Sequence, residues 1–211
     1  MKKFSTQQED FWAGSFGDEY ISRNTDSRLI ASNISLFSKI FNKTEKIHSI
    51  IEFGANIGLN LYAIHQLLPD AALSGVEINQ KAVEQLKKFE FVNVFHESML
   101  DFSCDFQWDF VFTKGVLIHI NPDYLEKVYK ILFKTSSKYI CLMEYYNPSP
   151  AEIPYRGHRD RLFKRDFAGE LMGYNKDLEL VDYGFVYHND INFPQDDLTW
   201  FLMRKNGNPH S

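Results

Sequence analysis

Short apolar runs alternate with helical stretches along most of this chain, and that alternation restricts its fold more than any other feature. Runs typical of buried strands lie at 48–53, 72–78, 91–95, 110–113 and 139–144. Parallel strands need a crossover between them, and helical crossovers are right-handed. We therefore predict an α/β fold around a mostly parallel, doubly wound sheet.

The helical stretches carry boundary signals of their own. Residues 27–41 place apolar side chains at helical spacing, with Asp26 as a candidate N-cap, and 59–68 has the same periodicity. Asn79 is a candidate N-cap for a helix that runs through Phe89. Asn121 followed by Pro122 predicts the start of another helix through Phe133.

The last quarter of the chain has a different pattern. Residues 179–188 and 198–204 read as two strands joined by a polar loop, which predicts an antiparallel hairpin and seven strands in all. Residues 145–157 contain three prolines and are expected to form a loop. We expect one domain, with a helical lid at 1–45, a cofactor-binding core at 46–145 and an acceptor side at 146–211.

Composition excludes several classes of protein. The chain is 44% hydrophobic and 24% charged with a net charge of -5, which disfavours a partner bound through many phosphates, such as nucleic acid. No apolar run is long enough for a membrane span, so we expect a cytoplasmic protein. Cys104 and Cys141 lack metal-ligand spacing, so we expect two buried thiols, no disulfide and no metal. Nothing indicates an oligomeric state.

The turn after the first strand predicts a ligand site. It reads Glu52-Phe-Gly54-Ala-Asn56-Ile-Gly58 and runs into the 59–68 helix. The two glycines allow a tight turn and a close approach of the backbone to a ligand. The free N–H groups at the start of the helix favour an anionic group. A nucleoside that carries a carboxylate would fit this turn.

Acidic and polar residues after the next strands are expected to surround the same crevice. Glu77 ends the second strand, where its carboxylate can accept hydrogen bonds from both ribose hydroxyls, with Ile78 beside it. An adenine would lie between the loops that hold Glu97, Ser98, Met99 and Lys114. Alternatively, Glu97 is a solvated loop acid and Met99 an ordinary core residue.

Two nucleotide cofactors compete for this pattern. A nicotinamide dehydrogenase shares the strand, glycine turn, helix and distal acid, but differs in glycine spacing and needs a second half-site. The spacing here is Glu-x-Gly-x-x-x-Gly, and Glu52 suits the amino acid end of S-adenosylmethionine. The pattern therefore favours S-adenosylmethionine as cofactor.

Three segments resemble the Rossmann-like class I methyltransferases: Glu52-x-Gly-x-x-x-Gly58, Gly75-Val-Glu77-Ile-Asn and 112–123. The resemblance covers about residues 48 to 144 and implies transfer of a methyl group from S-adenosylmethionine. Asn56 departs from the family, which usually has a third glycine there. Among residues other than glycine, asparagine best tolerates a positive φ.

A narrower resemblance extends over nearly the whole chain. The segments 8–24 and 144–167 are similar to the methylases associated with pseudaminic acid biosynthesis. This resemblance implies a bacterial cytoplasmic enzyme whose acceptor is a small anionic molecule, an acidic nine-carbon sugar or its nucleotide-activated form. A binding module that keeps the fold without turnover is the alternative.

Methyl transfer mainly requires that donor and acceptor be held in line, so few catalytic side chains are obligatory. A base would help with a hydroxyl or amine acceptor, and the candidates are His119, Glu144, Tyr155 and His158. The sequence does not choose among them. His119 could equally be a packing residue of its loop.

Basic residues gather at 155–165, in a chain that is otherwise acidic. Arg156 is the preferred contact for an acceptor anion, because arginine clamps a carboxylate with two hydrogen bonds; Tyr145, Tyr155 and His158 are further acceptor candidates. The alternative is a solvated amphipathic helix whose bases pair with nearby acids.

Aromatic residues are dense near the N-terminus, at Phe11, Trp12, Phe16 and Tyr20. They could form a lid whose ring faces attract the sulfonium charge, with Tyr20 or Arg23 reaching the carboxylate of the donor. Alternatively, this segment is a helix packed on the edge of the sheet.

Overall fold

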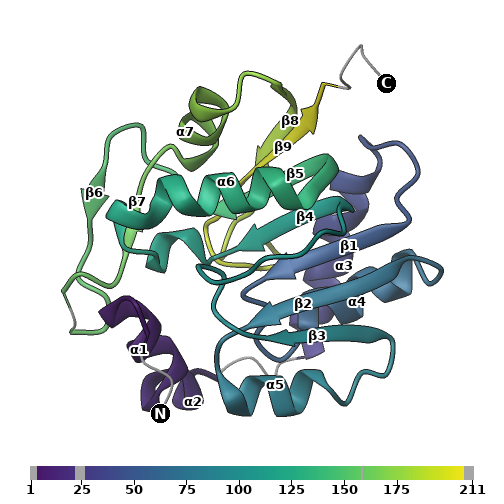
Figure 1. The fold of residues 1–211 in the computed structure, drawn as a ribbon. Coiled ribbons are helices and arrows are strands. Elements are labelled where there is room, and N and C mark those ends of the chain that lie inside the picture. The colour runs from purple at the N-terminus through teal and green to yellow at the C-terminus, as the bar shows by residue number, and fades with distance from the viewer. Residues whose placement is uncertain (1–3, 22–26, 158, 207–211) are drawn as a thin grey trace.

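A seven-stranded sheet forms the centre of the protein in the computed structural model, which describes residues 4–21, 27–157 and 159–206. The strands lie in the order β3-β2-β1-β4-β5-β9-β8 (Figure 1). β1 to β5 are parallel, and β9 pairs antiparallel with β5 and β8. The predicted doubly wound sheet with a C-terminal antiparallel hairpin is confirmed. The strand bounds are β1 (Ser49–Phe53), β2 (Ala72–Glu77), β3 (Val92–His96), β4 (Trp108–Lys114), β5 (Ser136–Glu144), β8 (Leu178–Phe185) and β9 (Thr199–Lys205).

Helices cover both faces of the sheet. One face packs against α3 (Ser27–Phe41), α4 (Leu59–Leu67) and α5 (Gln80–Leu86), and the other against α6 (Leu125–Thr135) and α7 (Phe167–Tyr174) (Figure 1). Side chains alternate between the two cores: Ile50 lies in the first core and the next residue, Ile51, in the second. A strand that is buried on both faces has a continuous run of apolar residues, and such runs made these strands recognisable in the sequence.

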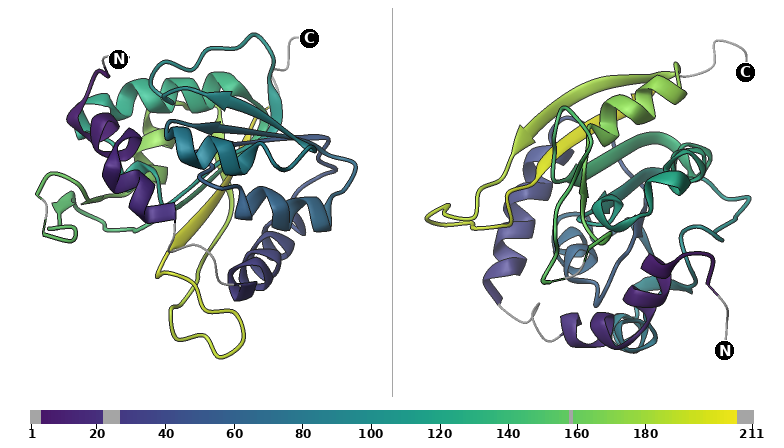
Figure 2. Two further views of the ribbon diagram at one scale, coloured as in Figure 1. Left: turned by 90° about the horizontal axis from the view of Figure 1, so that it is seen from below. Right: turned by 90° about the vertical axis from the view of Figure 1, so that its left-hand side faces the viewer.

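The carboxyl ends of the parallel strands meet two further groups of elements. Two short helices, α1 (Gln7–Ala13) and α2 (Ser15–Ile21), lie at this edge beside an arm that contains β6 (Ala151–Glu152) and β7 (Phe163–Lys164) (Figures 1 and 2). A side chain of α1 joins the two groups: Nε2 of Gln8 donates a hydrogen bond to the carbonyl oxygen of Asp160 at 3.0 Å. The loop after β4 forms two 3-10 turns, η1 (Leu117–His119) and η2 (Pro122–Tyr124).

The structure corrects several local expectations. The stretch 155–165 is not an amphipathic helix in its described residues, because Phe163 and Lys164 form β7 and pair with β6. The expected loop at 145–157 therefore includes a short strand. The helix predicted from Asn121 begins as a 3-10 turn and becomes α-helical at Leu125. Asp26, the expected cap of α3, lies outside the described residues.

The two cysteines differ in burial. Cys141 is buried in the core, whereas Cys104 is only half-buried, so the expectation of two buried thiols is wrong for Cys104. Both are free cysteines. Within the described ranges, no helix is long and apolar enough to cross a membrane.

Candidate functional site

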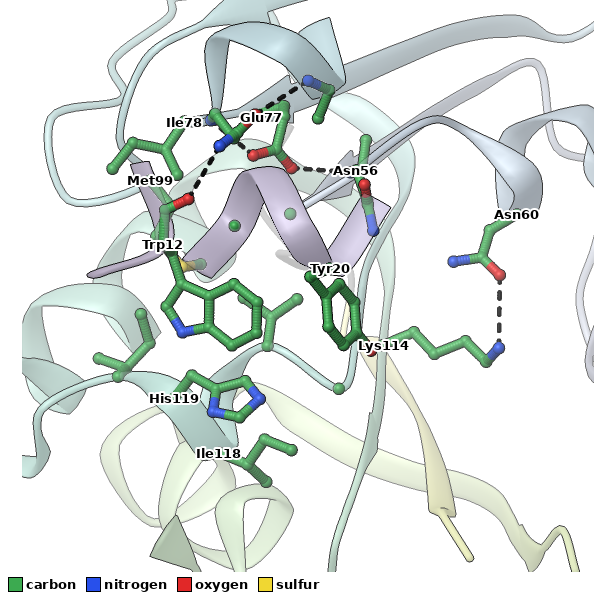
Figure 3. Close-up of a pocket in the computed structure, with 18 of the residues that line it drawn as sticks. Trp12, Tyr20, Asn56, Asn60, Glu77, Ile78, Met99, Lys114, Ile118 and His119 are labelled. Atoms are coloured by element: carbon green, nitrogen blue, oxygen red, sulfur yellow. Dashed lines mark hydrogen bonds between the residues drawn. The ribbon is translucent and has the colours of Figure 1, made fainter. Parts of the chain in front are cut away.

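A pocket of about 690 Å³ opens at the carboxyl ends of β1, β2 and β4. This volume lies within the range of roughly 300 to 1,000 Å³ that is usual for small-molecule sites. Its wall is built from α1, α2, the 54–60 turn, the ends of β2 and β4, η1, the arm and the loop between β8 and β9 (Figure 3). The pocket is thus at the switch point of the sheet, between β1 and β4.

The turn between β1 and α4 takes an unusual backbone conformation. Gly54, Asn56 and Gly58 have φ values of 76°, 48° and 84°, so the expected left-handed conformation of Asn56 is confirmed. A Cβ on Gly54 would lie 2.5 Å from Cγ2 of Val116, and one on Gly58 would lie 2.4 Å from Cδ1 of Leu86. Gly54 lines the pocket, whereas Gly58 does not. Gly58 serves the close packing of the turn on α5.

Glu77 lies on the pocket wall and holds the turn in place. Its Oε2 accepts a hydrogen bond from the backbone N–H of Asn56 at 2.7 Å, and its Oε1 accepts one from the N–H of Asn79 at 2.7 Å (Figure 3). Burial raises the pKa of this carboxyl, and backbone N–H donors of Asn79, Asn56 and Ile78 counteract the rise. A carboxylate has about four acceptor sites, so Glu77 keeps acceptor capacity for a ligand.

Glu52 does not line the pocket, contrary to the expectation that it contacts a ligand. The side chain is buried beneath the turn, where Oε1 accepts a hydrogen bond from Nδ2 of Asn60 at 2.6 Å. Burial raises the pKa of Glu52 to about 8. The pocket is reached by Asn60, which Glu52 orients.

The loop after β3 contributes all three of the residues expected from it. Glu97, Ser98 and Met99 line the pocket, and Met99 is also part of the core behind it, so its two alternative roles coincide. The hydroxyl of Ser98 donates a hydrogen bond to Glu9, whose other oxygen caps α1 through Thr6. This contact joins the N-terminal helices to the sheet.

The N-terminal aromatic residues meet the pocket through Trp12 and Tyr20, whose rings pack edge to face at 5.3 Å (Figure 3). Nδ2 of Asn79 donates to the carbonyl oxygen of Trp12 at 3.2 Å and to Oδ1 of Asp18 at 2.9 Å. Lys81 of α5 forms an ion pair with Asp18 at 2.7 Å. These contacts place α1 and α2 over the pocket. Arg23 lies outside the described residues.

His119 is a buried, neutral side chain on the pocket wall. Its Nδ1 lies 2.6 Å from the carbonyl oxygen of Arg161, and because a carbonyl only accepts, Nδ1 carries the proton. Nε2 is then left with a free lone pair. Burial lowers the pKa of His119 to about 4. The ring lies 4.5 Å from that of Trp12 and 5.1 Å from that of Tyr155.

Glu144 is not a wall residue of the pocket. Its carboxylate accepts hydrogen bonds from Oγ1 of Thr113 at 2.8 Å and from the backbone N–H groups of residues 116, 117 and 118 at 3.2, 3.1 and 3.4 Å. Burial raises its pKa to about 7. Glu144 therefore fixes the loop that carries His119, and its oxygens are already engaged.

The acceptor-side residues divide into two groups. Tyr145, Tyr155 and Arg156 line the pocket, and the guanidinium of Arg156 lies 5.6 Å from the ring centre of Tyr155. The φ of Arg156 is 50°, an unusual value for a residue with a side chain. His158 is outside the described part of the chain.

The other described basic residues of 155–165 do not line the pocket. Arg161 lies over the ring of Phe11 at 5.1 Å, and Lys164 lies over the ring of Tyr145 at 5.1 Å. Arg165 forms an ion pair with Glu170 at 2.8 Å. This pair agrees with the alternative interpretation, in which basic residues of this stretch pair with nearby acids. The basic cluster is therefore mainly a set of contacts that hold the arm.

Several pocket residues were missed in the sequence. Besides the expected Lys114, the pocket wall contains Asn33 of α3 and Asn60 of α4. It also contains Gln195 and Asp196, which belong to the loop between β8 and β9. Asn33 is a buried polar residue of α3, and a polar residue among the apolar positions of that helix is the signal that could have indicated it. Within the described part of the chain, no three or more potential metal ligands cluster together.

Comparisons with known proteins bear on the fold. No family model matches the chain, and no curated protein matches it. Among solved structures, magnesium protoporphyrin IX methyltransferase from Synechocystis PCC 6803 with bound S-adenosylmethionine matches with a TM-score of 0.67 at 12% identity, over 97% of this chain and 100% of that one.

Two further structures are similar. The plantazolicin methyltransferase BpumL in complex with S-adenosylhomocysteine has a TM-score of 0.65 at 16% identity, with 94% of both chains covered. The glycopeptide N-methyltransferase MtfA with S-adenosylmethionine has a TM-score of 0.62 at 10% identity, over 82% of this chain and 93% of that one. At these identities, the likeness establishes a shared fold.

Proposed function

We propose that this protein is an S-adenosylmethionine-dependent methyltransferase that acts on a small molecule. The observation that carries the proposal is the buried carboxylate of Glu77, which lies on the pocket wall and is hydrogen-bonded to the 54–58 turn. The structures that share the fold were solved with S-adenosylmethionine or S-adenosylhomocysteine bound. When bound, the cofactor would supply an electrophilic methyl group on a sulfonium.

The residues present fit such a cofactor. Glu77 keeps acceptor capacity for ribose hydroxyls, and Met99 offers an apolar contact for an adenine. Trp12 and Tyr20 present aromatic rings to the pocket, and an aromatic face attracts a sulfonium by roughly 0.5 to 2 kcal/mol. Tyr20, Ile78, Glu97 and Ser98 would complete the cofactor contacts.

A nicotinamide cofactor fits less well. A dinucleotide needs a second nucleotide-binding half, in the usual strand order 3-2-1-4-5-6 of parallel strands. Here the strand next to β5 is β9, which is antiparallel and comes from the C-terminal hairpin. The second half-site is thus replaced by the arm and the loop between β8 and β9.

For the acceptor, we propose an acidic sugar or a nucleotide-activated sugar of the pseudaminic acid pathway, in a bacterial cytoplasmic enzyme. The resemblance of 8–24 and 144–167 supports this class. Arg156 supports it as well, since it is an exposed cation at the pocket that could pair with a carboxylate or phosphate. Tyr155 beside it offers a ring face for a sugar.

Methyl transfer to pseudaminic acid and to its nucleotide-activated form tests the proposal. Mass spectrometry should detect an acceptor heavier by one CH2 unit together with S-adenosylhomocysteine, and neither in the absence of enzyme. Arg156→Ala should raise KM for the acceptor and leave cofactor affinity unchanged, with Lys130→Ala on the exposed face of α6 as the matched control. Cofactor binding without any transfer would favour the binding-module alternative.

A further inference from the structure

Lys114 is a half-buried cation on the pocket wall, at the last position of β4. Its Nζ donates to Oδ1 of Asn33 at 2.9 Å. It also donates to Oδ1 of Asn60 at 3.4 Å (Figure 3). The two asparagines come from α3 and α4, so they approach the ammonium from two elements. An ammonium has three donors, and this arrangement leaves one for a ligand.

The charge of Lys114 has no direct counter-ion among the described residues. Both hydrogen-bond acceptors of its Nζ are neutral amides, and the carboxylates of Glu52 and Asp196 act on it only through longer-range attraction. Burial lowers the pKa of Lys114 to about 8. A charge that is partly withdrawn from water is costly unless it is paired, so an anionic ligand group would be favoured beside this half-buried ammonium.

The position of Lys114 relative to Glu77 matches the two polar ends of the donor. β1 lies between β2 and β4, and neighbouring strands are about 4.8 Å apart, so the ends of β2 and β4 are separated by roughly 10 Å. Glu77 accepts hydrogen bonds at one end, and Lys114 presents a cation at the other. A nucleoside with hydroxyls at one end and a carboxylate at the other fits between them.

We propose that the ammonium of Lys114 binds the α-carboxylate of S-adenosylmethionine, while Asn33 and Asn60 hold Nζ in position. This inference rests on the proposed function and names the residue that recognises the amino acid end of the donor. Lys114 then distinguishes S-adenosylmethionine and S-adenosylhomocysteine from adenosine compounds that lack the carboxylate. The competing role is purely structural, in which Lys114 only ties α3 to α4.

Two ligands and one substitution separate these roles. S-adenosylhomocysteine carries the amino acid end, and 5′-methylthioadenosine has the same adenosine and sulfur without it. Calorimetry on the full chain should show that Lys114→Met weakens S-adenosylhomocysteine binding by at least about tenfold, the loss expected for a charged hydrogen bond. Binding of 5′-methylthioadenosine should not change. Lys130→Met, at an exposed ion pair on α6, is the control.

A second measurement compares two ligands on the wild-type protein first. Wild-type protein should bind the carboxamide derivative of S-adenosylhomocysteine more weakly than the carboxylate by a similar factor, and this difference should vanish in Lys114→Met. Equal weakening of both adenosine ligands in Lys114→Met, or no difference between carboxylate and carboxamide in the wild type, would overturn the carboxylate assignment. Absence of binding of every adenosine ligand to the wild type would instead refute the proposed function.

Discussion

At the scale of single residues, the site depends on a few buried groups whose charge states the surrounding protein sets. Glu77 combines two tasks, since it accepts N–H groups of the turn and keeps acceptor capacity for a ligand. His119 is also buried and Lys114 is half-buried, and desolvation lowers the pKa of both. Glu77, Lys114 and His119 thus give the pocket wall a carboxyl, an ammonium and a neutral imidazole at separate positions.

Glu77→Gln should weaken S-adenosylhomocysteine binding by at least about tenfold, because an amide has a single acceptor oxygen and bears no charge. Isothermal calorimetry measures the change. Glu84→Gln, on the exposed face of α5, should bind like the wild type. An unchanged affinity in Glu77→Gln would contradict the assignment of Glu77 to the ribose.

His119 should make the protein sensitive to acid. The unfolded histidine binds a proton near its ordinary pKa of 6.5, whereas the folded one does so only near 4. The unfolded state therefore binds more protons in this window, and the free energy of unfolding should fall as the pH drops from about 6.5 to about 4.

The replacement His119→Gln should remove that contribution, which is up to about 3 kcal/mol for a shift of this size. Urea unfolding of wild type and variant at several pH values gives the difference. If the free energy of unfolding changes with pH equally in the two proteins between pH 7 and pH 4, the folded state must protonate His119 as readily as the unfolded state does.

At the scale of elements, the 54–58 turn shows what backbone conformation demands of particular residues. Gly58 and Gly115 both have a positive φ, but a Cβ meets buried Leu86 at Gly58 and open space at Gly115. Gly115→Ala should cost about 1 to 2 kcal/mol, the usual penalty of a left-handed residue.

Gly58→Ala should be destabilised by the same penalty and by the clash, so its loss should exceed that of Gly115→Ala by about 1 kcal/mol or more. Denaturant titration of the two variants provides the comparison. Equal losses would mean that α5 moves away from the turn without cost.

The elements that could be predicted are those whose signal is local. The apolar periodicity of 27–41 coincides with α3, and the run that ends at Phe53 coincides with β1. β6 and β7 have two residues each, which is too short for an alternating pattern. The arm is instead held by long-range contacts, such as Arg161 on Phe11 and Gln8 on Asp160, which no local pattern shows.

The same distinction applies to the candidate site. Glu77 and the 54–58 turn could be found because the end of a parallel strand places a side chain at the crevice. Glu52 and Glu144 were assigned to the site by their positions at strand ends, yet neither side chain lines the pocket. Glu52 accepts a hydrogen bond from Asn60 beneath the turn, and Glu144 is hydrogen-bonded to the loop that carries His119. Asn33 and Asn60 come from the middle and the start of helices, and only the tertiary packing brings them to Lys114.

At the scale of the whole molecule, the proposed donor site lies at the ends of the sheet strands, and peripheral elements enclose it. The ends of β1, β2 and β4 supply the turn, Glu77 and Lys114, whereas α1, α2, the arm and the loop between β8 and β9 close the pocket (Figures 2 and 3). In the proposed function, the strand ends would hold the cofactor and the peripheral elements would hold the acceptor.

A crystal structure of the protein with S-adenosylhomocysteine tests the central claim most directly. The account predicts the ligand in the pocket, with both ribose hydroxyls within hydrogen-bond distance of Glu77 and its sulfur facing Trp12 and Tyr20. Soaked crystals in which the ligand is absent from this pocket, or lies there with its ribose away from Glu77, would contradict it.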